Sequence, residues 1–127
     1  MNHVLRILVI EHDLGDARAL ARGLSRHRVI VEHSVPVATE RLQAGEWFDV
    51  VVCEGSITGV NDVLSIAHSL PEPPLVVLLS DRDIGDARAS AILAKPFAVD
   101  QLLEVIYCLK QARARARTRV LACMAAK

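Results

Sequence analysis

Short runs of apolar residues alternate with segments of helical periodicity along the whole chain. The apolar runs occupy residues 6–10, 29–31, 49–53, 75–79 and 91–94, and most of them are rich in β-branched side chains. Runs of this length and composition are typical of strands that are covered on both faces of a parallel sheet. We therefore predict five short strands, of which the last has the weakest pattern.

The segments between these runs place their apolar residues on one face and predict helices. The first helix begins at Asp13 or Leu14, the second spans residues 35–44 and ends at Gly45, and the third spans residues 60–70 before a cluster of prolines. Helix-forming residues continue from Asp100 to about residue 125, so we expect an extended last helix. This alternation predicts an α/β fold with a doubly wound, five-stranded parallel sheet.

Polar residues follow four of the predicted strands. In doubly wound sheets, ligands bind at the carboxyl ends of the strands, near the point where the strand order reverses. We therefore expect the candidate site among the residues at these ends, which are Glu11, His12 and Asp13 after the first strand, Glu54 after the third, Ser80 after the fourth, and Lys95, Pro96 and Phe97 after the fifth.

Two of these strand ends carry a resemblance to a known family. Ala94, Lys95, Pro96 and Phe97 follow a short apolar strand, and Ser80 closes the strand before it. Together with the order of the elements, this pattern resembles the receiver domains of bacterial response regulators over roughly residues 5–109. The resemblance implies a flavodoxin-like sheet and a role in two-component signalling.

The resemblance also implies roles for the residues at the strand ends. In receiver domains, two adjacent acids after the first strand hold Mg²⁺, and an aspartate after the third strand accepts the phosphoryl group. A hydroxyl residue and a lysine after the last two strands contact that group. The corresponding positions of this chain are Glu11 and His12 for the acid pair, Glu54 for the acceptor, Ser80 for the hydroxyl and Lys95 for the lysine.

Two of these positions depart from the family pattern. His12 replaces a metal-binding acid, and Mg²⁺ prefers oxygen ligands in a strict octahedron, so we expect weak or absent Mg²⁺ binding and no other cofactor. Glu54 is one methylene longer than aspartate, and a misplacement near 1 Å can slow in-line transfer about a hundredfold. We therefore expect a pseudo-receiver that lacks ordinary phosphotransfer and is not an enzyme.

The polar residues of the pocket leave alternatives open. Glu54 either forms a permanent ion pair with Lys95 that imitates the phosphorylated state, or remains from a lost activity. Glu11 and Asp13 either hold a divalent cation loosely or are solvated carboxylates near a helix N-terminus. His12 is either a substituted ligand position without chemistry, or a phosphohistidine or a pH switch.

The segment between Ser80 and Lys95 also departs from the family. Receiver domains usually carry Tyr or Phe three residues before the lysine, where this chain has Ile92. The segment is shorter than is typical of the family, and residues 81–90 have room for about one helical turn. We expect a shortened or missing fourth helix, which would expose an edge strand or an apolar surface around residues 91–94 for a partner to cover.

The carboxyl-terminal part of the chain is strongly basic, although the formal net charge is +0. Residues 110–127 contain six of the 15 basic residues and none of the 15 acidic ones. We therefore divide the chain into a receiver-like domain, residues 1–109, and a basic helical extension, residues 110–127. Val120, Leu121, Cys123 and Met124 would support a homodimer. The arginines of this extension either lie on a solvated helix or bind a charged partner, which would be nucleic acid or an acidic protein surface. These arginines are Arg113, Arg115, Arg117 and Arg119.

Composition limits the class of protein. The chain has 127 residues, enough for one domain, and its hydrophobic fraction of 52% supports a core. No apolar run approaches the roughly 20 residues of a membrane span, and the first residues lack the cleavage region of a signal peptide. We expect a cytoplasmic protein without a membrane partner. Cys53, Cys108 and Cys123 are not spaced as zinc ligands, and we interpret them as buried, reduced thiols.

The favoured function is an atypical single-domain response regulator that acts in two-component signalling through phosphorylation-independent protein–protein interaction. Its partner would be a sensor kinase, a phosphotransfer protein or another regulator. One alternative is a transcriptional or nucleic-acid-binding regulator that uses the basic tail. A second alternative is a conventional phosphorylatable receiver.

Overall fold

The computed structural model describes residues 3–81 and 86–125. Its elements confirm the predicted strands and helices, with ends that differ by one or two residues. In chain order they are β1 (Arg6–Ile10), α1 (Leu14–Gly23), β2 (Arg28–Glu32), α2 (Val35–Gln43), β3 (Val50–Glu54), α3 (Val60–Ser69), β4 (Leu75–Ser80), β5 (Ala91–Ala94) and α4 (Val99–Ala125).

The five strands form one parallel sheet with the order β2-β1-β3-β4-β5. The chain moves outward from β1 to β2 and then returns past β1 to β3, so the strand order reverses between β1 and β3. Ile10 lies opposite Cys53 at the carboxyl end of this pair. The predicted doubly wound sheet is confirmed, and its ligand-binding edge is the one at which β1 and β3 end.

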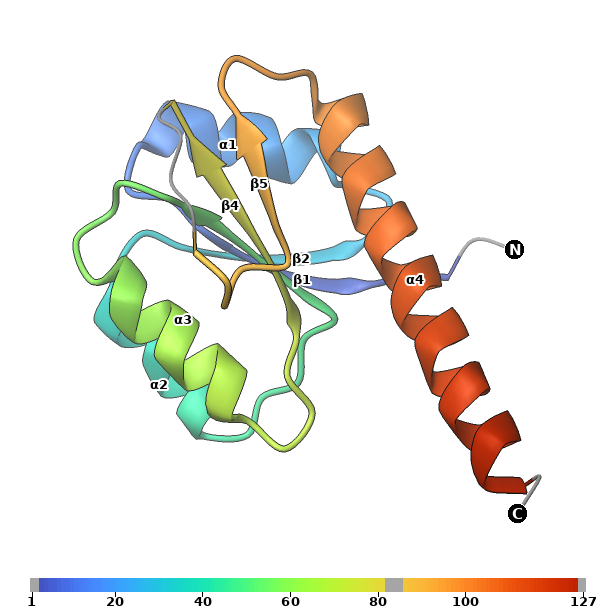
Figure 1. Ribbon diagram of the computed structural model, residues 1–127. Coiled ribbons are helices and arrows are strands. Elements are labelled where there is room, and N and C mark those ends of the chain that lie inside the picture. The colour runs from blue at the N-terminus through green and yellow to red at the C-terminus, as the bar shows by residue number, and fades with distance from the viewer. Residues whose placement is uncertain (1–2, 82–85, 126–127) are drawn as a thin grey trace.

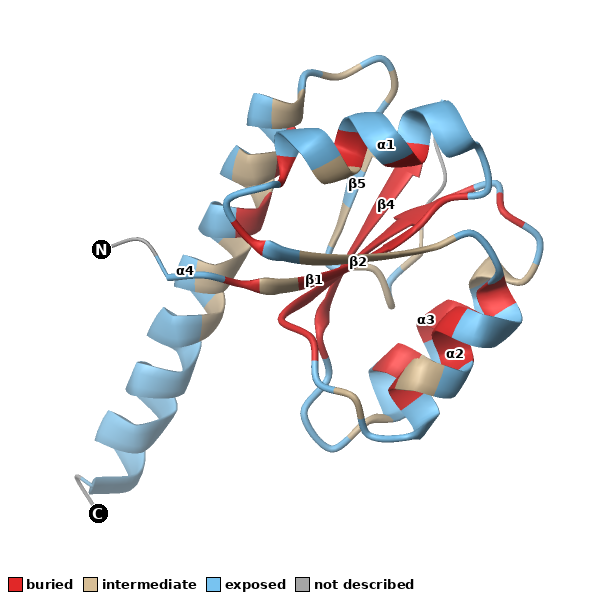
Figure 2. Ribbon diagram, turned by 180° about the vertical axis from the view of Figure 1, so that it is seen from behind, coloured by how far each residue is buried: buried red, intermediate tan, exposed pale blue. Residues whose placement is uncertain are grey.

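Helices cover both faces of the sheet (Figure 1), with α2 and α3 on one face and α1 with the first half of α4 on the other. Successive strand residues point to opposite faces. Accordingly, Leu8 and Ile10 join the core under α2 and α3, whereas Ile7 and Val9 join the core under α1 and α4. The buried residues concentrate in the central strands (Figure 2), and their lack of contact with water is the main stabilising term of the fold.

Local signals define the helix ends that border the candidate site. Asp13 caps α1, because its side chain accepts a hydrogen bond of 2.8 Å from the backbone N–H of Asp16. Gly59 precedes α3 with a φ of 94°, in the left-handed region that favours glycine. A Cβ at Gly59 would also lie 2.9 Å from Cγ1 of Val35 on α2. This glycine therefore allows α3 to begin close against α2.

No helix lies between β4 and β5 in the described part of the chain, which agrees with the expected shortened or missing fourth helix. Residues 82–85, on which the expected single helical turn partly falls, lie outside the described residues. The returning segment is attached to neighbouring elements instead. The Ser90 hydroxyl accepts a hydrogen bond from the N–H of Val76, and the Arg88 guanidinium donates to Ser65 and Asn61 of α3.

β5 is the edge strand beside β4, and among the described residues no helix lies between the two strands. Alternate residues of this strand are exposed, and Ile92 is 37% exposed. The prediction of an exposed edge strand around residues 91–94 is therefore confirmed.

The last helix, α4, continues without interruption from Val99 to Ala125, so the boundary predicted at residue 110 lies inside a helix. Leu102 and Ile106 anchor its first half in the core. Farther along, Lys110 contacts Asp49 and Arg113 donates to the Pro73 carbonyl. Residues 114–125 are exposed and project away from the sheet (Figure 2). Neither α4 nor any other described helix is long and apolar enough to cross a membrane.

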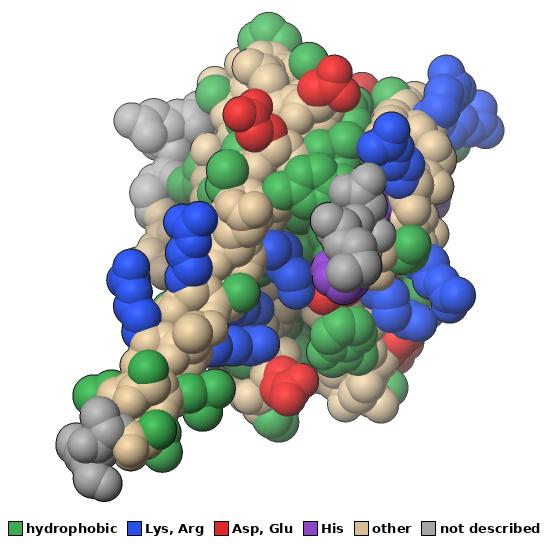
Figure 3. Space-filling view, turned by 90° about the vertical axis from the view of Figure 1, so that its right-hand side faces the viewer, with side chains coloured by type: hydrophobic (Ala, Val, Ile, Leu, Met, Phe, Trp, Pro, Cys, Tyr) green, Lys and Arg blue, Asp and Glu red, His purple; other side chains and the backbone are tan. Residues whose placement is uncertain are grey.

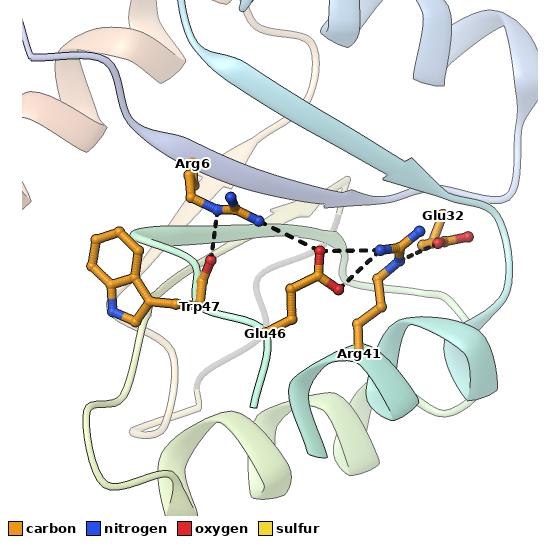
Figure 4. A network of polar contacts seen from close by, with 5 residues as sticks. All are labelled: Arg6, Glu32, Arg41, Glu46 and Trp47. Carbon is orange, nitrogen blue, oxygen red and sulfur yellow. Dashed lines mark hydrogen bonds and ion pairs between the residues drawn. The ribbon is translucent and has the colours of Figure 1, made fainter. Parts of the chain in front are cut away.

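A network of charged residues joins α2 to the sheet (Figure 4). Arg41 on α2 donates to Glu32 at the end of β2 and to both carboxylate oxygens of Glu46. Arg6 at the start of β1 lies 3.5 Å from the same Glu46 carboxylate and donates to the backbone carbonyl of Trp47. These contacts hold the loop between α2 and β3 against β1.

The three cysteines lie in different environments. Cys53 is fully buried in the core under α2 and α3, as predicted. Cys108 and Cys123 are exposed, so the interpretation of all three as buried thiols is wrong for these two. Both lie on α4, which has the sheet on one side and, in its second half, no packing partner among the described residues.

Candidate functional site

The polar residues at the carboxyl ends of the strands converge at the predicted edge of the sheet. β1 and β3 are neighbours and run parallel, so Glu11 and His12 after β1 come close to Glu54 at the end of β3. One ligand atom from each of these three side chains lies within 4.8 Å of the other two. The candidate site is therefore formed by Glu11, His12 and Glu54.

Glu54 is buried, and both of its carboxylate oxygens are engaged. Oε2 lies 2.5 Å from Nδ1 of His12, and Oε1 accepts a hydrogen bond of 2.9 Å from the hydroxyl of Ser56. An acceptor of a phosphoryl group needs an oxygen that is free to attack in line. Glu54, which the resemblance places at the acceptor position, is held here by His12, which it places at the position of a metal-binding acid.

Glu11 is almost completely buried, with 2% of its surface exposed. Its Oε2 lies 3.7 Å from Nδ1 of His12 and accepts no hydrogen bond from the described residues. The ring of His33 donates from Nδ1 to the Glu11 backbone carbonyl at 3.0 Å, which fixes the main chain at this point. A buried carboxylate oxygen without a donor is costly, and a proton shared with Glu54 or a bound cation would satisfy it.

The two carboxyl groups have opposite pKa shifts. Burial, together with the neighbouring Glu54, raises the pKa of Glu11 to about 7. Burial would also raise the pKa of Glu54, but hydrogen bonds with Glu11, Ser56 and His12 outweigh it and lower that pKa. The hydrogen bond with Glu54 raises the pKa of His12. Of the two carboxyl groups, Glu54 is therefore the more readily ionised, and it lies next to a His12 ring that favours its charged form.

Lys95 does not pair with Glu54 in the described structure, where the ion-pair partner of Glu54 is His12. The predicted contact that would imitate the phosphorylated state is therefore not formed. Instead, Lys95 lines a pocket of about 510 Å³ between α1 and the start of α4, together with Glu11 and Asp16. The positive charge of Lys95 opposes the rise in the pKa of Glu11.

Ser80 and Lys95 are adjacent through the backbone, since the N–H of Lys95 donates to the Ser80 carbonyl at 2.8 Å. Ser80 is buried at the end of β4. The Lys95–Pro96 peptide bond is cis. These residues lie at the predicted edge of the sheet, after β4 and β5.

Asp13 also lies outside the cluster, because its carboxylate accepts the hydrogen bond that caps α1. This contact agrees with its interpretation as a carboxylate at a helix N-terminus. The pairing of Glu11 with Asp13 as cation ligands is replaced by the grouping of Glu11 with His12 and Glu54.

Sequence reasoning missed two residues of the site, Ser56 and His33. Ser56 follows Glu54 by two residues, and a hydroxyl so close to a strand-end acid is a signal that was available. His33 follows β2, and its contact with Glu11 arises only because β2 pairs with β1. Its position among five scattered histidines carries no such information.

The basic residues of the tail lie far from this edge of the sheet. Arg115, Arg117 and Arg119 are exposed on the projecting half of α4, and Arg113 is half-buried where the helix leaves the body. Lys and Arg side chains are prominent along this helix in the space-filling view (Figure 3). The tail is therefore a second candidate surface, separate from the three-residue cluster.

Comparison with solved structures identifies the fold. A response regulator receiver protein from Sinorhizobium medicae has a TM-score of 0.72 at 22% identity and covers 87% of this chain and 98% of its own. A CheY-like receiver domain from Methylobacillus flagellatus has a TM-score of 0.70 at 17% identity, with coverage of 84% and 99%. A structure described as an adenylate cyclase from Rhodopirellula baltica has a TM-score of 0.76 at 20% identity, with coverage of 94% and 98%.

No family model matches the chain, and no curated protein matches it. The similar structures share less than 25% of their residues with this chain, so the likeness concerns the fold. Many of them are receiver domains, and their coverage extends over most of the chain. The chain therefore has the fold of a response regulator receiver domain.

Proposed function

We propose that this chain is an atypical response regulator of two-component signalling, a pseudo-receiver that binds a protein partner without being phosphorylated. The observation that supports this proposal is the contact of 2.5 Å between Oε2 of Glu54 and Nδ1 of His12. This contact occupies the acceptor position with a residue that also removes an oxygen ligand for Mg²⁺. The domain is then a non-enzymatic cytoplasmic module, and its partner is a sensor kinase, a phosphotransfer protein or another regulator.

The uncovered edge at β5 is the surface that we propose for this partner. Ile92 lies on β5, the last strand in the sheet order, and no described strand pairs with the outer side of β5. Such an edge can accept an additional strand or an apolar surface from another protein. Receiver domains carry an aromatic residue at the position of Ile92. In this chain, the same surface would bind the partner through an aliphatic side chain instead.

Phosphorylation is tested directly by incubation with acetyl phosphate and Mg²⁺, followed by intact-mass measurement. We expect no mass increase corresponding to a phosphoryl group. The matched control is the double variant His12→Asp with Glu54→Asp, which restores the family pattern and is expected to gain the adduct. A stable adduct on the unchanged chain that is lost in Glu54→Gln would overturn the proposal and support a conventional receiver.

The partner surface is tested by capture of co-expressed histidine kinases and phosphotransfer proteins with Ile92→Asp as the variant. Ile92 is on the surface, so the change is expected to leave thermal stability nearly unaltered while it weakens capture at least about tenfold, as for a central interface residue. Val37→Asp is the control, since Val37 is 42% exposed on α2 and is not part of the β5 edge. Equal effects of the two variants would exclude β5 as the binding surface.

A nucleic-acid-binding regulator is the second candidate function. The observation that favours it is the exposed, projecting half of α4, which carries Arg115, Arg117 and Arg119 and no acidic residue. Phosphate contacts of this kind depend steeply on salt concentration. Replacement of these three arginines by alanine preserves helix propensity and removes the charge.

The measurement for this candidate is a gel shift with duplex DNA over a range of salt concentrations. If the tail binds phosphates, the triple variant is expected to reduce the slope of log K against log salt by about 2–3. An unchanged slope, or no shift at low salt, would exclude this function.

A further inference from the structure

The fold implies a Mg²⁺ site at Glu11, His12 and Glu54, but the donor atoms do not fit this ion. Mg²⁺ requires a near-ideal octahedron of oxygen ligands and usually keeps several of its waters. The cluster offers one imidazole nitrogen and two carboxylates. Imidazole is a common ligand of zinc, copper, iron and nickel, and carboxylate oxygen completes many such sites.

We propose that Glu11, His12 and Glu54 bind a divalent transition-metal ion of the zinc and cobalt class in preference to Mg²⁺. This inference goes beyond the proposed function, because a pseudo-receiver can bind its protein partner with or without a metal. It assigns a binding role to the residue that disrupts the family pattern.

The distances between the side chains suit this class of ion. Zinc–nitrogen and zinc–oxygen bonds of about 2.0–2.2 Å place neighbouring ligands of a tetrahedron about 3.4 Å apart. Nδ1 of His12 lies 3.7 Å from Oε2 of Glu11, close to this separation. The distance from Nδ1 of His12 to Oε2 of Glu54 is 2.5 Å. This distance must lengthen by about 1 Å when an ion enters. The exposed His12 side chain can rotate by this amount, since 64% of its surface is in solvent.

The unpartnered oxygen of Glu11 is an independent observation that points to a cation. Its side chain is 3% exposed, and Oε2 is directed at the cluster without a donor from the described residues. A metal ion would place a positive charge next to this oxygen and between the two buried carboxylates. Without an ion, a proton shared between Glu11 and Glu54 would reduce their repulsion.

A neighbouring residue already orients one of the proposed ligands. The His33 ring holds only the main chain of Glu11, through its backbone carbonyl. The Ser56 hydroxyl engages Oε1 of Glu54, which leaves Oε2 directed at His12. Partners of this kind orient metal ligands and raise affinity in known metal sites. Three protein ligands with an exposed histidine leave the remaining positions of the ion open to water.

The experiment is a titration of the full chain, without an affinity tag, with Co²⁺ alone, followed by its visible absorption. Cys108 and Cys123 are exposed and are replaced by serine in all samples, so that they do not bind the metal. We expect saturation at one ion per chain, a spectrum without thiolate bands, and displacement by Zn²⁺. Mg²⁺ at about a hundredfold excess over Co²⁺ is expected to leave the spectrum unchanged.

Variants identify the ligands. His12→Ala and Glu54→Gln are each expected to weaken Co²⁺ binding at least about tenfold, the lower end of what loss of a supporting residue costs in metal sites. His68→Ala is the matched control, because His68 is exposed on α3 and lies outside the cluster, and its affinity should equal that of the parent. His12→Asp restores an oxygen ligand and is expected to shift the preference toward Mg²⁺.

Three results would overturn the proposal. They are the absence of saturable Co²⁺ binding, equal affinity in the parent and in His12→Ala, and displacement of Co²⁺ by an equal concentration of Mg²⁺. Thermal unfolding of each variant without metal shows whether a loss of binding reflects a loss of folding, and Glu54→Asp supplies a second, conservative ligand change. None of these outcomes bears on partner binding through β5, which is measured separately.

Discussion

The hydroxyl of Tyr107 on α4 lies 2.9 Å from Nε2 of His27, in the turn before β2. On the other side of the same ring, the backbone N–H of Leu5 donates to Nδ1 at 3.0 Å. Because Nδ1 accepts a hydrogen bond, the neutral ring carries its proton on Nε2 and donates it to Tyr107. A second proton on Nδ1 would displace the N–H of Leu5, so the neutral ring is the form that joins β1, β2 and α4.

We predict that His27 titrates below its ordinary pKa of 6.5 and destabilises the fold in acid. Burial lowers the pKa of His27, and the nearby charge of Arg26 lowers it further, against an opposing effect of Asp49. A depressed histidine pKa gives stability that is complete above about pH 6.5 and is lost as the pH falls through the folded-state pKa. An NMR titration of the ring resonances measures this pKa, and a midpoint at or above 6.5 would contradict the prediction.

The effect of His27 on stability must be measured as a difference from a His27→Gln variant. Burial and the neighbouring Glu54 raise the pKa of Glu11 to about 7, and a raised carboxyl pKa makes stability decrease as the pH rises between about 4.5 and 7. The contribution of Glu11 to the pH dependence of stability therefore has the opposite sign to that of His27 in the same pH range. We expect the parent to lose more stability than His27→Gln between pH 6.5 and 5 in urea denaturation.

Gly23, the last residue of α1, allows Val99 at the start of α4 to approach closely. A Cβ at Gly23 would lie 2.5 Å from Cγ1 of Val99. Alanine is better than glycine in a helix by about 0.5–1 kcal/mol, but overpacking costs about 1–3 kcal/mol, so we expect Gly23→Ala to destabilise the fold. Urea denaturation measures the change. Addition of Val99→Ala should recover part of the loss, whereas additive effects of the two changes would contradict the steric explanation.

Asp49 holds two parts of the chain through its two carboxylate oxygens. Oδ2 accepts from the N–H of Arg6 at 2.9 Å, and Oδ1 accepts from the ammonium of Lys110 at 3.0 Å. We expect Asp49→Ala to lower the free energy of unfolding by about 1–3 kcal/mol, because it leaves the Arg6 N–H without its partner. Lys110→Met should cost less than about 1 kcal/mol, since the ion pair is partly exposed. Equal losses in denaturant titrations would show that the ion pair dominates.

The cysteines are predicted to react at very different rates. Burial raises the pKa of Cys53 to about 12, with smaller contributions from Glu54 and Glu11, so its thiolate is scarce and shielded. We expect a thiol reagent at pH 8 to modify Cys108 and Cys123 in the folded chain, and Cys53 only after denaturation. Peptide mapping by mass spectrometry assigns the modified sites. Rapid modification of Cys53 in the native state would contradict its placement in the core.

The fold was predictable from the sequence because its signals are local. Apolar runs of three to five residues, glycines and prolines at the helix ends, and the long Ala- and Arg-rich segment each act within a few residues. The edge of the sheet that carries Glu11, His12, Glu54, Ser80 and Lys95 followed from strand direction alone. The shortened segment between β4 and β5 was predictable too, and no helix lies there among the described residues.

The pairing among these side chains was decided by the tertiary structure. Glu54 contacts His12 and Ser56 rather than Lys95, because β1 ends beside β3 while Lys95 turns toward the pocket between α1 and α4. In the same way, Cys123 is exposed because α4 leaves the body, whereas Cys108 is exposed on the side of α4 that faces away from the sheet. The sequence by itself determined at which edge of the sheet the site lies, since that depends on strand direction. Which atoms meet there depends on packing between elements distant in the chain, and only the folded structure contains that information.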